Sequence, residues 1–316
     1  MNFQQLRIIR EAARRDCNLT EVANALYTSQ SGVSRHIREL EEELGIALFV
    51  RHGKRLLGMT EPGKELLVLA ERILSDAHNI RKLASSFANR ESGRLLVATT
   101  HTQARYALPR VIQAFREQFP QVQLELHQGG PDEIVRLLQA GAVDIGISSE
   151  RLDHSDGVVA FPYYRWHHNV VVPAGHPLTG QPDLTLAQLA QWPIITYQSG
   201  LTGRARVDEA FANAGIEPEI LLTAQDSDVI KTYVELDMGV GILADMAFDA
   251  NRDSGLVQLD GSHLFAPHTA WLGLKQGQFQ HNFVWQFIQL CNPALSLTDI
   301  QSRVMGAVEN SLDYQI

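Results

Sequence analysis

The chain has 316 residues, of which 45% are hydrophobic and 20% charged; this composition fits two or three globular domains and excludes a disordered chain. Its only cysteines, Cys17 and Cys291, are too few for a disulfide framework, so a reducing cytoplasm is expected. The N-terminus lacks the apolar core of a signal peptide, and no apolar run reaches the roughly 20 residues of a membrane span, so we expect neither export nor membrane insertion.

The net charge of −9 is unevenly distributed along the chain. Residues 1–90 contain 14 Lys and Arg against 11 Asp and Glu, whereas residues 91–316 contain 13 against 25. A mildly basic N-terminal part on an acidic body is a pattern that suits a nucleic-acid-binding head.

Residues 18–45 have the pattern of two short helices joined by a tight turn. Asn18 and Glu21 have capping-box spacing at the start of the first helix, and Thr28 or Ser29 can cap the second. An amphipathic helix before them is expected to pack beneath the pair through Phe3, Leu6, Ile9, Ala12 and Ala13. The second helix carries an apolar stripe that we expect to be buried, formed by Val33, Ile37, Leu40 and Leu44.

The opposite face of that second helix carries hydroxyls, an amide and guanidiniums. Such groups reach base edges and phosphates in the major groove of DNA. The pattern therefore predicts a helix-turn-helix whose second helix is the recognition helix, with an ordinary surface hairpin as the alternative. The residues predicted to contact DNA here are Ser29, Gln30, Ser31, Ser34, Arg35 and Arg38.

A glycine-centred basic loop follows at residues 51–55. Ile46, Leu48 and Phe49 before it are expected in the core, and Leu56 and Leu57 after it can form a short returning strand. In this position a basic loop is typical of a wing, which places cations against sugar and phosphate; a solvated charged loop is the alternative. The loop reads Arg51, His52, Gly53, Lys54 and Arg55, of which Arg51, Lys54 and Arg55 are predicted to contact DNA.

Residues 60–87 are predicted to form one helix about 40 Å long, at 1.5 Å per residue. Thr60 can cap it, with Pro62 tolerated in the first turn. Apolar residues then recur at alternating spacings of four and three, which is the a/d seam of a coiled coil. We interpret this helix as linker and dimerisation element, with packing on its own chain as the alternative; the seam comprises Leu66, Ala70, Ile73, Ala77, Ile80, Ala84 and Phe87.

From residue 91 the pattern changes to alternating strands and helices, which is typical of an α/β fold. A first unit contains strands at 95–100, 122–127 and 143–148 and helices at 102–119 and 132–140. A second contains strands at 168–173, 193–197, 219–223 and 239–244 and helices at about 184–190, 203–214 and 229–236. We expect 269–274 to return to the first unit as a strand, 281–290 to be helical, and the tail after Pro293 to be peripheral. Two such lobes joined by crossing strands are expected to form a cleft for a small ligand.

This order of elements resembles the LysR-type transcriptional regulators over the whole chain. Four segments resemble the sulfur-assimilation branch of that family: TSQSGVSRHIRELEEELG (28–45), TTHTQARYALP (99–109), LTGR (201–204) and DSDVIKTYVEL (226–236). MNFQQL at the start and LDYQI at the end are similar to members that control sulfonate utilisation. The resemblance implies an N-terminal all-α winged helix-turn-helix with a long linker helix, followed by a C-terminal α/β bilobal effector domain like a periplasmic binding protein.

The resemblance also implies an effector site, and the residues give it a physical rationale. Thr99 to Gln103 and Thr202 to Arg204 each lie where a strand ends and a helix begins, and helix N-termini favour anions. Read locally, each hydroxyl could simply cap a helix. The positions that the resemblance assigns to effector contact are Thr100, Thr102, Gln103, Ser149 and Thr202, with Ser149 where the branch has threonine. The implied effector is a small anion of the sulfate, thiosulfate, acetylserine or adenosine phosphosulfate class, shared by the two lobes.

No catalytic residue, metal ligand or cofactor is predicted. A nucleophile elbow, a P-loop, HExxH and CxxC are all missing from the sequence, so an enzyme is not expected. His167 and His168 are adjacent on a predicted strand and point to opposite faces, so they cannot share a metal. Asp226, Asp228 and Lys231 are interpreted as a salt bridge at the hinge between the lobes.

The predicted organisation is a DNA-binding domain at 1–59, a linker and dimerisation helix at 60–90 and an effector domain at 91–316. Within the last, lobe I spans about 91–162 and 267–316, and lobe II about 163–266. The predicted function is a cytoplasmic activator of sulfur or sulfonate assimilation genes, which binds promoter DNA as a homo-oligomer, a dimer of dimers, with RNA polymerase as a candidate partner. The alternatives are a LysR-type regulator of another pathway and a solute-binding protein.

Overall fold

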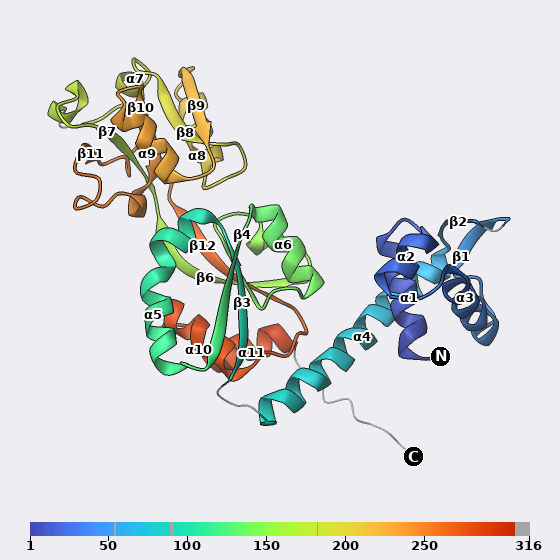
Figure 1. Ribbon diagram of the computed structural model, residues 1–316. Coiled ribbons are helices and arrows are strands. Elements are labelled where there is room, and N and C mark those ends of the chain that lie inside the picture. Colours follow the sequence, from blue (N-terminus) through green and yellow to red (C-terminus); the bar gives the residue numbers. More distant parts are fainter. Residues whose placement is uncertain (54, 89–91, 182, 307–316) are drawn as a thin grey trace. The chain divides into compact units, whose positions relative to one another are not determined.

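The computed structural model describes residues 1–53, 55–88, 92–181 and 183–306. It divides into two compact units, Met1–Ser85 and Ser86–Ile316. Figure 1 colours the chain from blue at the N-terminus to red at the C-terminus. Within the described residues, no helix is both long and apolar enough to cross a membrane.

The first unit consists of three helices, a two-stranded hairpin and most of a long helix. Its elements are α1 (Phe3–Arg14), α2 (Leu19–Ala25), α3 (Gln30–Leu44), β1 (Phe49–His52), β2 (Arg55–Met59) and α4 (Glu61–Ala88). β1 and β2 pair antiparallel, which is the predicted wing. The core contains Val33, Ile37 and Leu40 from α3, together with Ile8 and Ile9 from α1.

Three of the predicted core positions in this unit are wrong, one of which is Phe3, at the start of α1, which is 50% exposed. The other two are Leu44 and Ile46. Leu44 is 38% exposed and Ile46 is 41% exposed. Both lie at the end of α3, where Gly45 adopts φ = 70° and terminates the helix. The chain therefore turns away before the apolar stripe gains its last member, whereas Leu48 and Phe49 are buried as predicted.

Helix α4 uses part of the predicted seam within its own chain. Ala70 is buried and packs with Leu6 of α1 and Leu74, so it is not free for a second helix. Further along, Ile73 and Ile80 are exposed. The large exposed apolar residues of α4 are Val68, Leu69, Ile73, Ile80 and Leu83, and Ala84 of the seam is exposed as well. The side chain of Phe87 lies outside those described.

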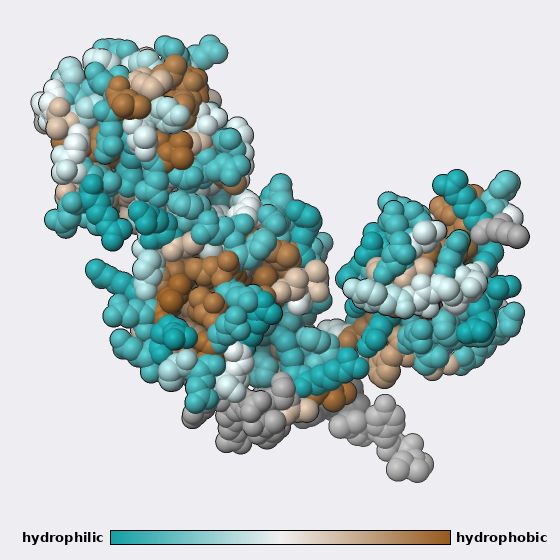
Figure 2. Space-filling model, in the orientation of Figure 1, coloured by the Kyte–Doolittle hydropathy of each residue, from teal (hydrophilic) through white to brown (hydrophobic). Residues whose placement is uncertain are grey.

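The second unit contains two five-stranded sheets, each the centre of one lobe (Figure 1). The first lobe has the strand order β4-β3-β5-β12-β6, with β3 (Gly93–Thr99), β4 (Val122–Gln128), β5 (Ile145–Ser148), β6 (Val158–Trp166) and β12 (His268–Lys275). Its helices are α5 (Leu108–Gln118), α6 (Pro131–Ala140), α10 (Asn282–Cys291) and α11 (Leu297–Met305), with a π-helical turn η1 (Gln103–Ala107) before α5. Figure 2 shows apolar side chains gathered on this lobe over α5 and β4.

The second lobe has the strand order β11-β7-β10-β8-β9. Its strands are β7 (His168–Pro173), β8 (Ile194–Tyr197), β9 (Ile220–Ala224), β10 (Val240–Ala244) and β11 (Leu256–Leu259), and its helices are α7 (Leu186–Leu189), α8 (Arg204–Asn213) and α9 (Ser227–Glu235). Short 3-10 turns are η2 (Leu152–His154) in the first lobe and η3 (Pro177–Gly180) and η4 (Asp245–Ala247) in the second. The chain crosses between lobes once between β6 and β7, at His167, and returns between β11 and β12.

Both sheets are mixed, because the strands next to the crossings run antiparallel to their neighbours. β12 is antiparallel to β5 and β6, and β7 is antiparallel to β10 and β11. The remaining pairs are parallel: β3 with β4 and β5 in the first lobe, and β8 with β9 and β10 in the second. The sequence did not predict β6 or β11.

The prediction of a peripheral tail is also wrong. Residues beyond Pro293 form α11, and its Ile300 and Val304 are fully buried in the core of the first lobe. Arg303 of the same helix lies over the ring of Phe161, 4.5 Å from its centroid, and donates to the Ala160 carbonyl. α11 is therefore part of the lobe.

Candidate functional site

The recognition helix α3 presents the predicted polar residues on one face. Residues 30, 31, 34, 35 and 38 fall within about half a turn of a helix with 3.6 residues per turn. Ser29 caps the helix, since its Oγ accepts from the Gly32 N–H at 3.1 Å. Ser34 is half-buried and the remaining members are exposed: Ser29, Gln30, Ser31, Arg35 and Arg38.

The two arginines of this face are held only by weak surface contacts. Arg35 pairs with Glu39 at 3.5 Å and both are exposed; Arg38 Nε donates to the Ser34 carbonyl at 3.3 Å. Surface ion pairs of this kind contribute at most about 1 kcal/mol. DNA can therefore replace these partners at little cost.

Arg51 has a different environment from the other predicted DNA contacts. It pairs with Glu41 of α3 at 2.5 Å, and the same carboxylate accepts from the main-chain N–H groups of Leu48 and Phe49. Arg51 thus ties β1 to the recognition helix, and its guanidinium is already engaged. Lys54 lies outside the described residues.

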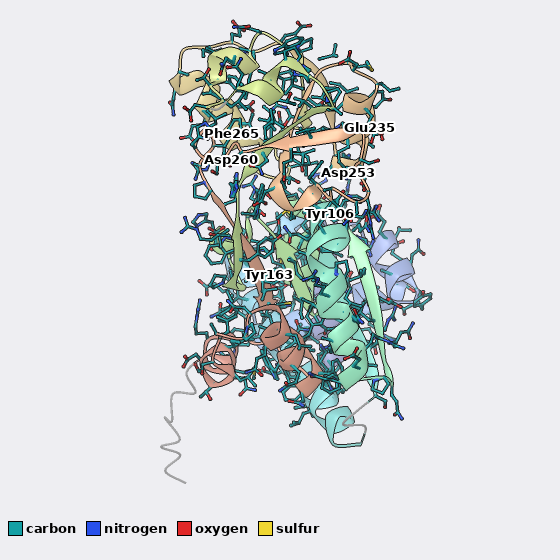
Figure 3. All side chains as sticks on the ribbon, turned by 90° about the vertical axis from the view of Figure 1, so that its left-hand side faces the viewer. Tyr106, Tyr163, Glu235, Asp253, Asp260 and Phe265 are labelled. Carbon is teal, nitrogen blue, oxygen red and sulfur yellow. The ribbon has the colours of Figure 1, made fainter. Side chains whose placement is uncertain are left out.

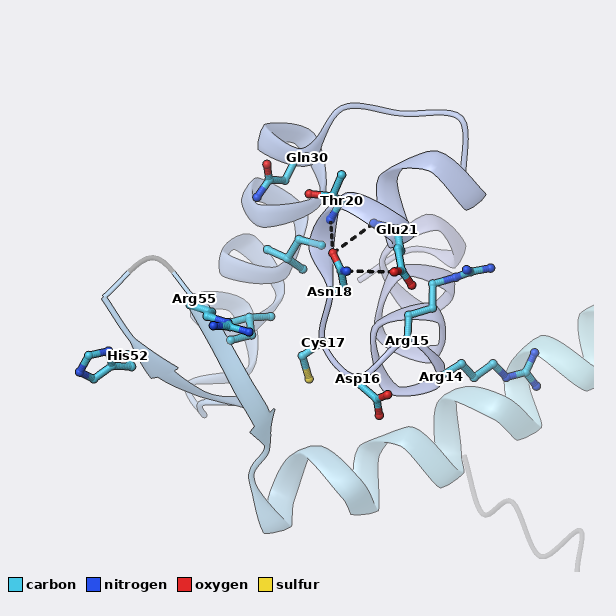
Figure 4. Close-up of a pocket in the computed structure, with 12 residues that line it drawn as sticks. Arg14, Arg15, Asp16, Cys17, Asn18, Thr20, Glu21, Gln30, His52 and Arg55 are labelled. Atoms are coloured by element: carbon cyan, nitrogen blue, oxygen red, sulfur yellow. Dashed lines mark hydrogen bonds between the residues drawn. The ribbon is translucent and has the colours of Figure 1, made fainter.

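Arg55 lines a concavity of about 780 Å³ beside the recognition helix. Figure 4 shows Gln30 of α3 at its edge, the wing residues His52 and Arg55 on one side, and Arg14 and Arg15 from the end of α1 on the other. The sequence interpretation missed Arg14 and Arg15, although two adjacent arginines immediately before a helix-turn-helix are a visible signal. The concavity also contains the acids Asp16 and Glu21, and Asn18 caps α2 there.

In the effector domain, the predicted residues of the first lobe lie together where β3 and β5 end. Thr102 and Gln103 are each only 1% exposed, and Thr100 is buried. Gln103 begins the π-helical turn η1, where the sequence predicted an uninterrupted helix; π turns occur frequently at functional sites. Gln103 Oε1 accepts from the Tyr164 hydroxyl at 2.7 Å.

Ser149 follows β5 and contacts the crossing strand. Its Oγ accepts from the indole Nε1 of Trp166 at 2.9 Å. Trp166 stacks on His268 with ring centroids 4.4 Å apart, and His268 begins the strand that returns from the second lobe. The Ser149 hydroxyl therefore contacts, through the rings of Trp166 and His268, the place where the chain passes between the two lobes.

In the second lobe, Thr202 and Gly203 form a left-handed turn before α8, with φ of 42° and 70°. Thr202 is buried, and its carbonyl is paired with His168 Nε2 at 3.1 Å. A β-carbon on Gly203 would lie 2.3 Å from His268 Nε2, so only glycine fits at this position. The turn is thus enclosed by His168 and His268, two residues that the sequence interpretation did not assign to the site.

Glu150, also unassigned by the sequence, bridges the lobes at this turn. The main-chain N–H of Gly203 donates to Glu150 Oε1 at 2.5 Å. Burial raises the pKa of Glu150 to about 7, against this hydrogen bond, which favours the charged form. The main-chain N–H of Gly203, at the helix start where an effector anion is predicted, is therefore occupied by a carboxylate of the chain itself.

The two histidines here are neutral at physiological pH. Burial lowers the pKa of His168 to about 3 and that of His268 to about 4, the latter with help from the nearby charge of Arg206. His167 has different surroundings, since its side chain is half-exposed and lies 3.4 Å from Asp245. This agrees with the prediction that His167 and His168 point to opposite faces of the strand. These imidazoles can accept or donate hydrogen bonds but supply no positive charge.

A second contact between the lobes involves the charged group predicted at the hinge. Asp228 of α9 accepts from the Tyr106 hydroxyl at 2.8 Å and from Arg105 Nε at 3.1 Å, both in η1 of the first lobe. Lys231 lies 3.4 Å from Asp228 and 3.0 Å from Asp253, and Figure 3 shows Tyr106 and Asp253 near each other where the lobes meet. The predicted salt bridge is confirmed for Asp228 and Lys231, whereas Asp226 instead caps α9.

His101, Asp226 and Asp228 could in principle hold a metal ion. One ligand atom from each lies within 4.8 Å of the others. However, Arg105 and Lys231 already neutralise Asp228. Burial opposes ionisation of Asp228, but the hydrogen bond from Tyr106 and these two cations outweigh it and lower its pKa. The two neighbouring cations make this an unfavourable place for a metal.

Comparison with known proteins matches two family models to the chain. The LysR substrate binding domain covers residues 88–296, and the bacterial regulatory helix-turn-helix protein model of the lysR family covers residues 3–64. The chain is 62% identical to the HTH-type transcriptional regulator cbl of Escherichia coli (strain K12) over 316 residues, all of both chains. It is 54% identical to the HTH-type transcriptional regulator SsuR of Burkholderia cenocepacia, covering 98% of this chain and 100% of that one.

A solved structure of the cofactor-binding domain of the Cbl transcriptional regulator is also similar. It has 56% sequence identity and a TM-score of 0.67, and the match covers 69% of this chain and 96% of that one. The predicted bilobal effector fold is confirmed by this match.

Proposed function

Because the chain belongs to the LysR family of transcriptional regulators, in the sulfur-assimilation branch close to Cbl, we propose that it is an activator controlled by a small effector bound where its two lobes meet. The helix-turn-helix and the effector domain lie on one chain, and the relatives are named transcriptional regulators. The effector acts on transcription through DNA binding, and no catalysis is involved. The site of action is the cytoplasm.

The observation that carries this proposal is the burial of unsatisfied polar groups at the lobe junction. The Thr102 hydroxyl and Glu150 Oε2 are buried and have no hydrogen-bond partner among the described residues. Buried polar groups are nearly always paired in folded proteins, so a group of unpaired ones at the ends of two strands supports a ligand site. We assign effector contact to Thr100, Thr102, Gln103, Ser149 and Thr202.

DNA recognition is assigned to the exposed face of α3. Arg35 and Arg38 suit base edges or phosphates, and Gln30 and Ser31 lie in the first turn, which enters the major groove in this class of motif. Arg55 of the wing suits the sugar-phosphate backbone. Residues 1–59 thus read DNA, residues 60–90 connect, and residues 91–316 sense the effector.

The oligomer is assigned to α4. Ile80 is 67% exposed and Ile73 is exposed seven residues before it, which is one heptad on a face that nothing in the described chain covers. A second copy of this helix would bury that face. Dimers would then pair into tetramers, and RNA polymerase is the proposed partner at the promoter.

A gel-shift titration of the full chain tests the proposed function. Promoter fragments of sulfur-assimilation genes should be retarded at protein concentrations that leave unrelated promoters free, and an added effector should change the midpoint. Equal retardation of all fragments would favour a regulator of another pathway.

A further inference from the structure

Glu150 occupies the place at which the second lobe would bind an anion. α8 has 10 residues and its N-cap is Gly203, which has no side chain to cap the helix. Helix starts attract anions through free N–H groups and the positive end of the helix dipole. At this one the N–H groups of Arg204 and Arg206 already donate to the Leu201 and Gly203 carbonyls. Here the Gly203 N–H is filled by Glu150 Oε1, which comes from the first lobe.

The second oxygen of the same carboxylate is the unusual feature. Glu150 Oε2 is buried and has no hydrogen-bond partner among the described residues. Within that part of the chain, Glu150 also forms no ion pair, and the nearby cations have other partners: Arg204 pairs with Asp208, and Arg206 with Glu209. An acceptor that is buried and unpaired costs about 1–3 kcal/mol.

Other buried and unpaired polar atoms come from residues at the same lobe junction. Thr102, in the first lobe, is 1% exposed with an unpartnered hydroxyl. His268 Nε2 is likewise buried without a partner and lies against Gly203. The unpaired groups therefore come from both lobes, and none of them carries a positive charge that would bind a second anion beside Glu150.

We propose that Glu150 determines effector specificity: the effector presents its anionic group to Thr100, Thr102 and Gln103 and a hydrogen-bond donor to Glu150 Oε2. This inference rests on the proposed effector site. A ligand whose surface is only anionic would face the carboxylate in a desolvated place, where like charges repel strongly. A site built around a buried acceptor also rejects a ligand that cannot donate to it.

The four effector classes that the family resemblance implies differ in whether they carry a hydrogen-bond donor for Glu150. Acetylserine and adenosine phosphosulfate carry O–H or N–H donors beside their acidic groups. Sulfate and thiosulfate have none at neutral pH. At mildly alkaline pH, where Glu150 is ionised and its Oε2 can only accept, the donor-bearing classes should therefore bind better at this junction, and replacing Glu150 should reduce that advantage.

Hydrogen phosphate and sulfate are matched probes for this idea. At mildly alkaline pH both are tetrahedral dianions of similar size, and only hydrogen phosphate has an O–H to donate. Calorimetric titration of the full chain with each ion gives a ratio of dissociation constants. Glu150→Gln keeps the shape and an acceptor for Gly203 but places an N–H₂ group where Oε2 lies; Glu117→Gln, exposed on α5, removes the same charge elsewhere.

The wild type and Glu117→Gln should prefer hydrogen phosphate, and Glu150→Gln should shift the ratio at least tenfold towards sulfate. Glu150→Ala, which frees the Gly203 N–H, should also bind sulfate more tightly than the wild type does. An unchanged ratio in Glu150→Gln, or an equal loss for both ions, would overturn the inference and leave Glu150 as a structural link between lobes.

Thr102→Val separates this inference from the proposed function. If Thr102→Val weakens both ions while Glu150→Gln leaves the ratio unchanged, only the role of Glu150 is refuted. If hydrogen phosphate does not bind the wild type, the inference is refuted. If Thr102→Val changes the affinity for neither ion, the effector site itself is refuted, and the inference with it.

Discussion

The hydroxyl of Tyr106, in the first lobe, donates a 2.8 Å hydrogen bond to the carboxylate of Asp228, in the second. The Lys231 ammonium lies over the ring of Tyr106, 5.4 Å from the ring centroid. Lys231 also donates a hydrogen bond to Asp253. Because Tyr106 belongs to the same π-helical turn as Gln103, this contact connects the candidate effector residues of one lobe to helix α9 of the other.

Tyr106→Phe should therefore destabilise the effector domain. The change removes a hydrogen bond to a charged group, which contributes about 1.5–3 kcal/mol to the free energy of unfolding. Tyr163→Phe is the matched control, since the Tyr163 hydroxyl contacts uncharged groups, with a long 3.4 Å bond to the Ala107 carbonyl and a contact with the Cys291 thiol. Urea unfolding measures both; equal losses in the two variants would show that the bond to Asp228 contributes nothing special.

The arginines of the DNA-binding unit should divide by role. Arg35→Ala should weaken binding to a cognate promoter by about 1–3 kcal/mol and relax sequence preference, as expected for a bidentate base contact. Arg55→Ala should weaken all sequences alike and flatten the dependence on salt, because a phosphate contact releases counterions. Fluorescence anisotropy with cognate and scrambled duplexes distinguishes them, and identical profiles for the two variants would refute the assignment.

Glu41 should prove to be a structural residue of the wing. Its carboxylate accepts from the Leu48 and Phe49 N–H groups and pairs with Arg51, so Glu41→Ala leaves two main-chain donors unpaired at about 1–3 kcal/mol. The melting temperature of the DNA-binding unit should fall. Glu42→Ala, exposed one position along α3, should leave it unchanged, and an equal effect of both would contradict the role given to Glu41.

The oligomer is tested on the exposed face of α4. Ile80→Glu should weaken self-association, because a second helix would bury an unpaired carboxylate there. Arg81→Glu changes the neighbouring exposed position, which lies off the stripe, and should matter less. Sedimentation that finds Ile80→Glu as oligomeric as the parent would mean that the chains associate elsewhere.

The sequence predicted those parts of the fold whose signal is local. Strand β7 matches its predicted bounds, His168–Pro173, because a continuous apolar run between turn residues indicates a buried strand. The recognition helix was likewise visible in its cap and its two faces. Helix α11 was missed because only Ile300 and Val304 mark its buried face, which is too short a pattern to recognise.

The site was only half visible in the sequence, for a physical reason. Hydroxyls at strand ends are a local pattern that also fits helix caps, so it is the family resemblance that assigns Thr100, Thr102 and Thr202 to the effector. Glu150 lies 53 positions from Gly203 in the sequence, and no local sequence pattern around either residue predicts their contact. The pairing depends on how two lobes meet, which periodicity and caps do not encode.

The central claim is that a small effector binds at the lobe junction, and ligand-dependent thermal denaturation tests it most directly. Sulfate, thiosulfate, acetylserine and adenosine phosphosulfate are each added to the full chain and to Thr102→Val. The wild type should melt at a higher temperature with at least one of them, because a ligand bound only to the native state stabilises it. Thr102→Val should melt like the wild type without ligand and lose most of that shift. An undiminished shift in Thr102→Val would place the effector elsewhere and contradict the account.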